Sequence, residues 1–268
     1  MIEFFAHLPD GFTETRIRSE VTDLIGLGTL VNTAAVLAGS GIGLFLKGGL
    51  KKRFQDTLMQ GLGLATMFIG AGGAMKGMLV VSGSGLDTKG TMVLILSLVI
   101  GALLGELLNI ELFLERLGEK IQKRVQKKEE GTFVEGFVTS SLVICVGAMA
   151  IVGSLQDGMS GDPSTLYVKA ALDFVIVLIF ASTFGIGVMF SALPVFVYQG
   201  AMTLFASVLK PLFTAELIAN LSFVGSVLIF AVGVNIAFGK KIKVANLLPS
   251  MLVPAVIQGI MSIGGWSM

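Results

Sequence analysis

Long stretches without charge constrain this chain more than any motif does. Charged residues make up 14% of the sequence, and they gather in short segments between apolar runs of about twenty residues. A helix of that length spans the hydrocarbon core of a bilayer. A soluble fold would expose more apolar surface than water tolerates, so the pattern predicts an all-α, polytopic transmembrane helix bundle.

Polar breaks divide the chain into about eight predicted spans. These are roughly 24–46, 57–81, 91–110, 132–155, 164–189, 190–210, 216–239 and 247–265. No charge separates the fifth span from the sixth; only small residues and Pro194 do. Residues 184–194 are therefore either a tight turn or an unwound intramembrane segment, and the alternative is seven spans with these two fused.

Basic residues predict which side each loop faces. They lie mainly in segments 47–53, 111–128 and 240–243. Eight alternating spans place all three segments on one side, which the positive-inside rule makes cytoplasmic, and place both termini outside. Seven spans would put the basic segments on different sides, so we prefer eight.

The spans suggest a division of the chain into five parts. These are an extension (1–23), a first three-helix unit (24–110), a cytoplasmic linker (111–131), a second three-helix unit (132–210) and a C-terminal helical hairpin (211–268). An odd number of spans inverts the second unit relative to the first, as in inverted-repeat transporters. The extension lacks the pattern of a cleavable signal peptide.

The linker is predicted to begin with an amphipathic helix, because apolar residues recur at helical spacing between Ile110 and Val125. Such a helix either lies on anionic headgroups or docks a partner. Within the spans, Gly39 and Gly43, like the pairs 73/77 and 101/105, are four residues apart. That spacing favours close helix packing and offers faces for a homo-oligomer.

Polar residues inside the spans are the candidates for function. Asp173 lies about ten residues inward from the start of its span, near the bilayer midplane, and Asn32 and Gln199 fall at similar depth. A carboxylate there is costly unless it is protonated, paired or hydrated. Lys169, one turn earlier, shares its helix face, so the alternative is a purely structural Lys169–Asp173 bridge.

A wider set of polar residues completes the predicted substrate or ion path. It comprises Asn32, Gln60, Lys76, Glu106, Gln156, Asp157, Lys169, Asp173, Tyr198 and Gln199. Lys76 falls at about the depth of Lys169, whereas Glu106 is close to a cytoplasmic span end and therefore reads as interfacial.

Several function classes are disfavoured. With Cys145 as the single cysteine, no intrachain disulfide or cysteine metal site forms, and we expect neither a metal nor a cofactor. HExxH, GxSxG and GxxxxGK[ST] motifs are absent, so the chain is not expected to be an enzyme. A net charge of +1 gives no reason to expect a nucleic-acid partner.

Several segments together resemble one bacterial membrane-protein family, domain of unknown function 554, from about residue 24 to the end. The segments are Gly28–Ser40, Asp56–Gly63, Gly101–Glu106, Val146–Gly158, Phe190–Gly200 and Lys240–Pro249. The resemblance implies a protein of the bacterial inner membrane with the lipid bilayer as its partner. It carries over no substrate and no catalytic residue.

These observations favour a transporter of a small polar or ionic solute. Asn32, Asp173 and Gln199, with Gln156 and Asp157, would line a central cavity, and Asp173 would take up a proton or cation. The alternatives are a non-transporting membrane scaffold or sensor, in which the polar residues only join helices, and a channel.

Overall fold

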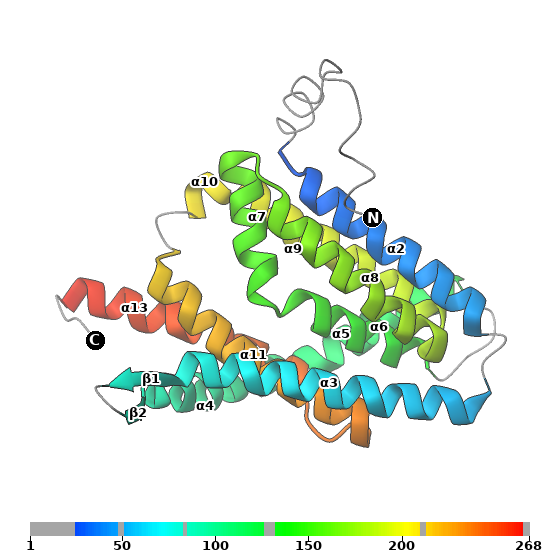
Figure 1. Cartoon of the computed structure of the whole chain (residues 1–268), viewed down its shortest axis with the longest axis horizontal. Coiled ribbons are helices and arrows are strands. Elements are labelled where there is room, and N and C mark those ends of the chain that lie inside the picture. Colours follow the sequence, from blue (N-terminus) through cyan, green and yellow to red (C-terminus); the bar gives the residue numbers. More distant parts are fainter. Residues whose placement is uncertain (1–24, 48–50, 83–84, 126–131, 210–212, 265–268) are drawn as a thin grey trace, which may run out of the picture.

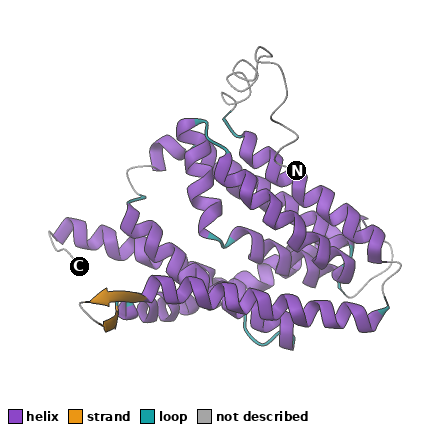
Figure 2. Cartoon of the chain, in the orientation of Figure 1, coloured by secondary structure: helices purple, strands orange, loops and turns teal. Residues whose placement is uncertain are grey.

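The computed structural model describes residues 25–47, 51–82, 85–125, 132–209 and 213–264. Almost all of this is helical, with one small β-hairpin (Figure 2). The polytopic all-α prediction is confirmed by six helices that are long and apolar enough to cross a membrane, or seven if one bent pair counts as a span. The predicted extension 1–23 lies outside the described residues.

The described part of the first half contains four helices and the hairpin. They are α2 (Leu27–Lys47), α3 (Lys52–Met78), β1 (Leu79–Ser82), β2 (Gly85–Thr88), α4 (Thr91–Leu108) and α5 (Ile110–Val125). The antiparallel hairpin pairs Leu79 with Thr88 and was not predicted. Helix α3 starts within the basic segment that the sequence assigned to a loop.

The second half contains more broken helices. They are α6 (Phe133–Cys145), α7 (Ala148–Ser160), α8 (Ser164–Phe184), η2 (Ile186–Ser191), α9 (Ala192–Leu204), α10 (Ala206–Leu209), α11 (Ala215–Phe238), α12 (Val244–Leu247), η3 (Leu248–Met251) and α13 (Val253–Gly264). The predicted spans 132–155 and 247–265 are thus not continuous helices. The first of these spans is divided between α6 and α7, which meet at 61°. The second is divided into the end of α12, η3 and α13.

The stretch between α8 and α9 is a tight turn at Gly185, whose φ of 88° is a backbone conformation that favours glycine. A 3₁₀ helix, η2, follows and leads directly into α9. The fifth and sixth spans are therefore separate, with their boundary at 185 rather than at 189–190.

Helices α2 and α8 pack along their whole length, and α9 joins them (Figure 1). Glycines make this approach possible, because a Cβ at Gly39 or Gly43 would collide with a carbonyl oxygen of α8, that of Phe174 or Leu178. The predicted packing role of these glycines is confirmed.

A second group forms around α3 and α11, with α4, η3 and α13 beside it (Figure 1). Gly63, Gly70 and Gly77 of α3 face α11, while Gly101 and Gly105 of α4 face Ser250 and Asn246. The pairs 73/77 and 101/105, which the sequence offered to an oligomer, are thus occupied by contacts within one chain.

The two packing groups cut across the units suggested by the sequence. Helix α2 packs on α8, from the predicted second unit, whereas α3 packs on α11, from the predicted hairpin. The division into inverted units stays a prediction. Helix α5 forms as expected, but Leu114, Leu117 and Ile121 pack against the core, so α6 covers much of its apolar face.

Candidate functional site

Four polar side chains meet between α2, α8 and α9, within the first packing group. Asn32, Lys169, Asp173 and Gln199 are 0%, 5%, 3% and 0% exposed. Asp173 lies about 14 Å along α8 from its first residue and about 16 Å from its last, hence near the middle of the helix. We call these four residues the midhelix cluster.

An ion pair forms the centre of the midhelix cluster. Lys169 Nζ lies 2.5 Å from Asp173 Oδ2, one helical turn along α8. Two opposite charges buried together cost far less than either alone, because each compensates the other for the lost hydration. Removal of either partner would leave the remaining charge isolated in an apolar interior.

Asn32 links this pair to α9. Its Nδ2 donates to Asp173 Oδ2 at 3.0 Å and to Gln199 Oε1 at 3.2 Å. A carboxylate only accepts, so Asp173 fixes the orientation of the Asn32 amide. As a result, Asn32 Oδ1 and Gln199 Nε2 are buried without a hydrogen-bond partner among the described residues.

Polar groups continue toward the N-terminal end of α2. Thr29 Oγ1 and Thr203 Oγ1, one turn from Asn32 and Gln199, lie 3.4 Å apart. The two halves of the bent pair, α6 and α7, both pack against α8 and α9. A broken helix beside a buried charge is a common arrangement in transporters.

Asp157 and Gln156 lie apart from the ion pair, near the C-terminal end of α7. Asp157 is fully buried, and its Oδ2 accepts the backbone N–H of Gly28 at 3.2 Å, at the start of α2. That contact satisfies an end-of-helix donor and favours the α2 dipole. Gln156 Oε1 accepts from Thr165 Oγ1 at 2.6 Å.

The remaining predicted path residues do not join the midhelix cluster. Lys76 and Gln60 are exposed on α3. Glu106 is exposed on α4 and bonds Lys243 Nζ at 2.8 Å. Tyr198 on α9 is half-buried against a small apolar cluster that includes Leu155 and Leu217.

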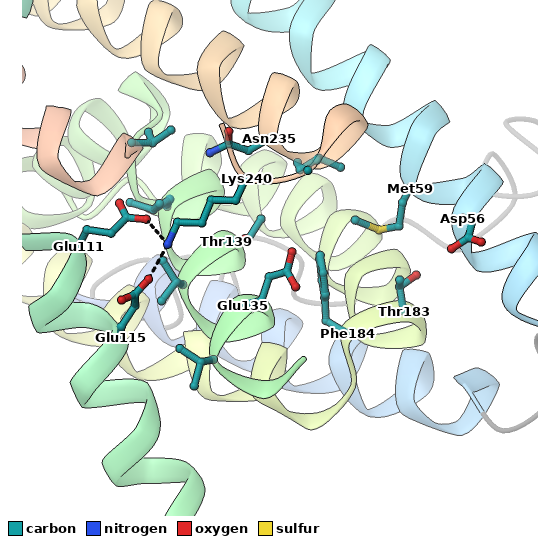
Figure 3. Close-up of a pocket in the computed structure, with 16 residues that line it drawn as sticks. Asp56, Met59, Glu111, Glu115, Glu135, Thr139, Thr183, Phe184, Asn235 and Lys240 are labelled. Atoms are coloured by element: carbon teal, nitrogen blue, oxygen red, sulfur yellow. Dashed lines mark hydrogen bonds and ion pairs between the residues drawn. The ribbon is translucent and has the colours of Figure 1, made fainter. Parts of the chain in front are cut away.

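A cavity of about 440 Å³ lies where α6 and the end of α8 meet α3, α5 and α11, and none of its lining residues belongs to the midhelix cluster (Figure 3). Four carboxylates line it: Asp56, Glu111, Glu115 and Glu135. They come from the starts of α3, α5 and α6, and Lys240, from the loop after α11, lies beside them. The basic segments 111–128 and 240–243 therefore meet at this cavity.

Lys240 holds α5 against the end of α11. Its Nζ lies 2.9 Å from Glu111 Oε1 and 2.5 Å from Glu115 Oε1 (Figure 3). Burial lowers the pKa of Lys240, but these two carboxylates outweigh it, so the pKa lies above its ordinary value. Glu111 Oε2 also accepts the N–H of Ala245 at 3.1 Å.

Asn246 closes the same junction. Its Oδ1 accepts the backbone N–H of Glu111 at 2.7 Å, and its Nδ2 donates to Glu106 Oε2 at 2.7 Å. The sequence assigned Glu111 and Glu115 only to an amphipathic helix face and gave Lys240 and Asn246 no site role. Their partners are more than 120 residues away in the chain, so local patterning gave no signal of the cavity.

Among the described residues, no group of three or more His, Cys, Asp or Glu side chains is placed to hold a metal ion. The geometry instead combines long apolar helices, a buried ion pair at mid-helix and a broken helix beside it. These features define a polytopic helical membrane protein with a polar centre.

The family described as "Protein of unknown function (DUF554)" matches residues 27–258, and the chain belongs to this family. It is 36% identical over 230 residues to the "Uncharacterized membrane protein YdfK" of Bacillus subtilis (strain 168), covering 86% of this chain and 94% of that one. It is 31% identical over 227 residues to the "Uncharacterized protein YqgA" of Escherichia coli (strain K12), covering 85% and 94%. No solved structure matches the chain significantly.

Proposed function

We propose that the protein is a non-enzymatic carrier for a small polar or ionic solute, driven by a proton or cation that binds at Asp173. The observation that carries the proposal is the buried Lys169–Asp173 pair at the middle of a membrane helix. Charges at that depth are rare and costly, and in membrane proteins they commonly mark ion and solute pathways.

The mechanism follows from the competition for Asp173. In the described state, the Lys169 ammonium neutralises the carboxylate. A proton or cation that takes this position frees Lys169, and the altered charge distribution favours a different packing of α8 against α2 and α9. Binding energy that differs between two packings is what shifts a conformational equilibrium.

The cavity supports the same proposal. It is lined by α3 and α11 on one side and by α6 and the end of α8 on the other, so a motion of the first packing group against the second would change its shape. Residues of the basic segments 111–128 and 240–243 line it, and we propose that this side faces the cytoplasm across the bacterial inner membrane.

Reconstituted vesicles test the proposal. Proteoliposomes that enclose a pH-sensitive dye, and matched ones that enclose a sodium- or potassium-sensitive dye, would receive pulses of sodium, potassium or choline chloride, with and without pooled amino acids, amines and carboxylates. We expect solute-dependent changes in internal pH or internal alkali-ion concentration with the wild-type protein, and at least a tenfold loss of rate in Asp173→Asn.

Asp87→Asn, in the exposed β-hairpin, is the matched control and should transport normally. Unchanged flux in a folded Asp173→Asn protein would rule out the coupling role. Absence of flux under every condition in the wild type would favour the scaffold.

A further inference from the structure

The midhelix cluster holds more oxygen atoms than its ion pair needs. Asp173 Oδ2 and Gln199 Oε1 lie 3.0 and 3.2 Å from the same atom, Asn32 Nδ2, so the three side-chain ends converge. A further oxygen, Asn32 Oδ1, is fully buried and has no partner in the described part of the chain. A buried acceptor left unpaired costs about 1–3 kcal/mol, which calls for an explanation.

We propose that Asp173, Asn32 and Gln199 form a binding site for a hard, monovalent alkali cation, which exchanges with the Lys169 ammonium. This inference rests on the proposed function and names the ion that drives it. In the described state Lys169 occupies the site, with its Nζ 2.5 Å from Asp173 Oδ2.

The charge of the cluster selects a monovalent ion. Asp173 is the only acidic side chain in the midhelix cluster, so it balances one positive charge once Lys169 moves away. Calcium and magnesium sites draw on several carboxylates or retain much of the ion's water shell, which this fully buried position does not supply. A divalent ion would leave an uncompensated charge in an apolar interior.

The ligand atoms select a hard ion. Carboxylate and amide oxygens suit hard cations, and the cluster contains neither a thiolate nor an imidazole. A half-turn of the Asn32 amide exchanges Oδ1 with Nδ2 while the side chain keeps its shape. After that turn, Asn32 Oδ1 takes the place of Nδ2, 3.0 Å from Asp173 Oδ2 and 3.2 Å from Gln199 Oε1, so oxygens of the three residues lie close enough together to coordinate one cation.

The same half-turn of the Asn32 amide distinguishes a metal cation from a proton. A proton on Asp173 is shared with one acceptor only, Asn32 Oδ1 at the former place of Nδ2, whereas a cation uses oxygens of all three residues as ligands. Lys169 then acts as an internal competitor, because its ammonium and the bound ion exclude each other from Asp173.

Equilibrium binding of radioactive ²²Na⁺ to the purified full-length protein in lipid nanodiscs tests this inference. We expect saturable binding that unlabelled sodium or potassium chloride displaces and that choline chloride does not. Lys169→Gln, which removes the competitor, should bind at least tenfold more tightly than wild type. Asn32→Ala and Asp173→Asn should each bind at least tenfold more weakly.

Lys123→Gln, an exposed lysine of α5, controls for the loss of one positive charge and should match wild type. An alkali chloride should also raise the unfolding temperature of the wild type, and Asn32→Ala should cancel that rise, which tests the site even where Lys169→Gln does not fold. Binding that is no tighter in folded Lys169→Gln, or displaced by calcium better than by sodium and potassium, would overturn the inference.

The two proposals fail in different ways. Loss of flux in Asp173→Asn vesicles without any alkali-ion binding would leave a proton-driven carrier and remove the cation site. Tight cation binding at Asp173 with unchanged flux in Asp173→Asn would keep the site and remove the transport role.

Discussion

Two lysine–carboxylate pairs in this molecule contain the same chemical groups in opposite surroundings. Lys169 and Asp173 have side chains that are 6% and 5% exposed, in the middle of a membrane helix. Lys240, whose side chain is 53% exposed, meets Glu111 and Glu115 at the edge of a cavity. Distance alone does not measure the importance of an ion pair, because the Lys240–Glu115 contact, at 2.5 Å, is as short as the Lys169–Asp173 contact.

Hydration accounts for the different contributions of these two ion pairs to stability. Water near Lys240 solvates the separated charges almost as well as the pair, so the pair gains little. Around Asp173 no such alternative exists, and the separated charges are costly. Lys240 therefore stabilises the junction of α5 with the end of α11, whereas in the proposed mechanism the Lys169–Asp173 pair makes α8 depend on which cation occupies its centre.

Removal of the buried acid should have the largest effect. Asp173→Ala leaves the Lys169 ammonium buried without compensation, and we expect a loss of about 3–5 kcal/mol in stability. Glu115→Ala, at the exposed pair, should lose at most about 1 kcal/mol. Unfolding in detergent, followed by a thiol-reactive dye that reports exposure of Cys145, compares the two, and equal losses would remove the distinction.

Removal of the exposed base should have a smaller, salt-dependent effect. Lys240→Ala should cost about 1 kcal/mol or less at low ionic strength, and the difference from wild type should shrink in about 1 M salt, where screening is strong. The stability difference caused by Lys169→Ala should persist at the same salt concentration. A salt-insensitive Lys240→Ala difference would show that the cavity edge is as dry as the midhelix cluster.

Alkaline titration should have the smallest effect. The pKa of Lys240 is raised in the folded state, so its contribution is complete below the ordinary lysine pKa of about 10.4 and is lost as pH rises through the higher folded value. Wild type should therefore lose stability relative to Lys240→Ala only above about pH 10. A convergence of the two unfolding temperatures below pH 9 would contradict this assignment.

The sequence predicted the individual members of the midhelix cluster, because a polar side chain deep within an apolar run is conspicuous. It also predicted that Gly39 and Gly43 serve helix packing. It did not predict that Asn32 and Asp173, 141 residues apart, share a hydrogen bond, because periodicity describes single helices and not their neighbours.

Helix breaks and the cavity escaped prediction for a related reason. The apolar run through Cys145 has the length of one span, yet the chain bends there by 61°. Lys240 and Glu111 look like ordinary loop and surface charges until the fold brings α5 against the end of α11. Contacts of this kind depend on tertiary packing, which local sequence does not encode.

The central claim is that the region around Asp173 becomes accessible to water when the driving ion exchanges with Lys169. Cysteine accessibility tests it most directly, with Thr203→Cys, one turn from Gln199, in a chain whose single native cysteine is changed by Cys145→Ser. Membrane-impermeant thiol reagents would be applied from each side of oriented vesicles, with sodium, potassium or choline present. We expect the labelling rate to differ at least fivefold between alkali ions and choline, and the side from which labelling is faster to change with the ion. Absence of labelling from both sides under all conditions would contradict the account.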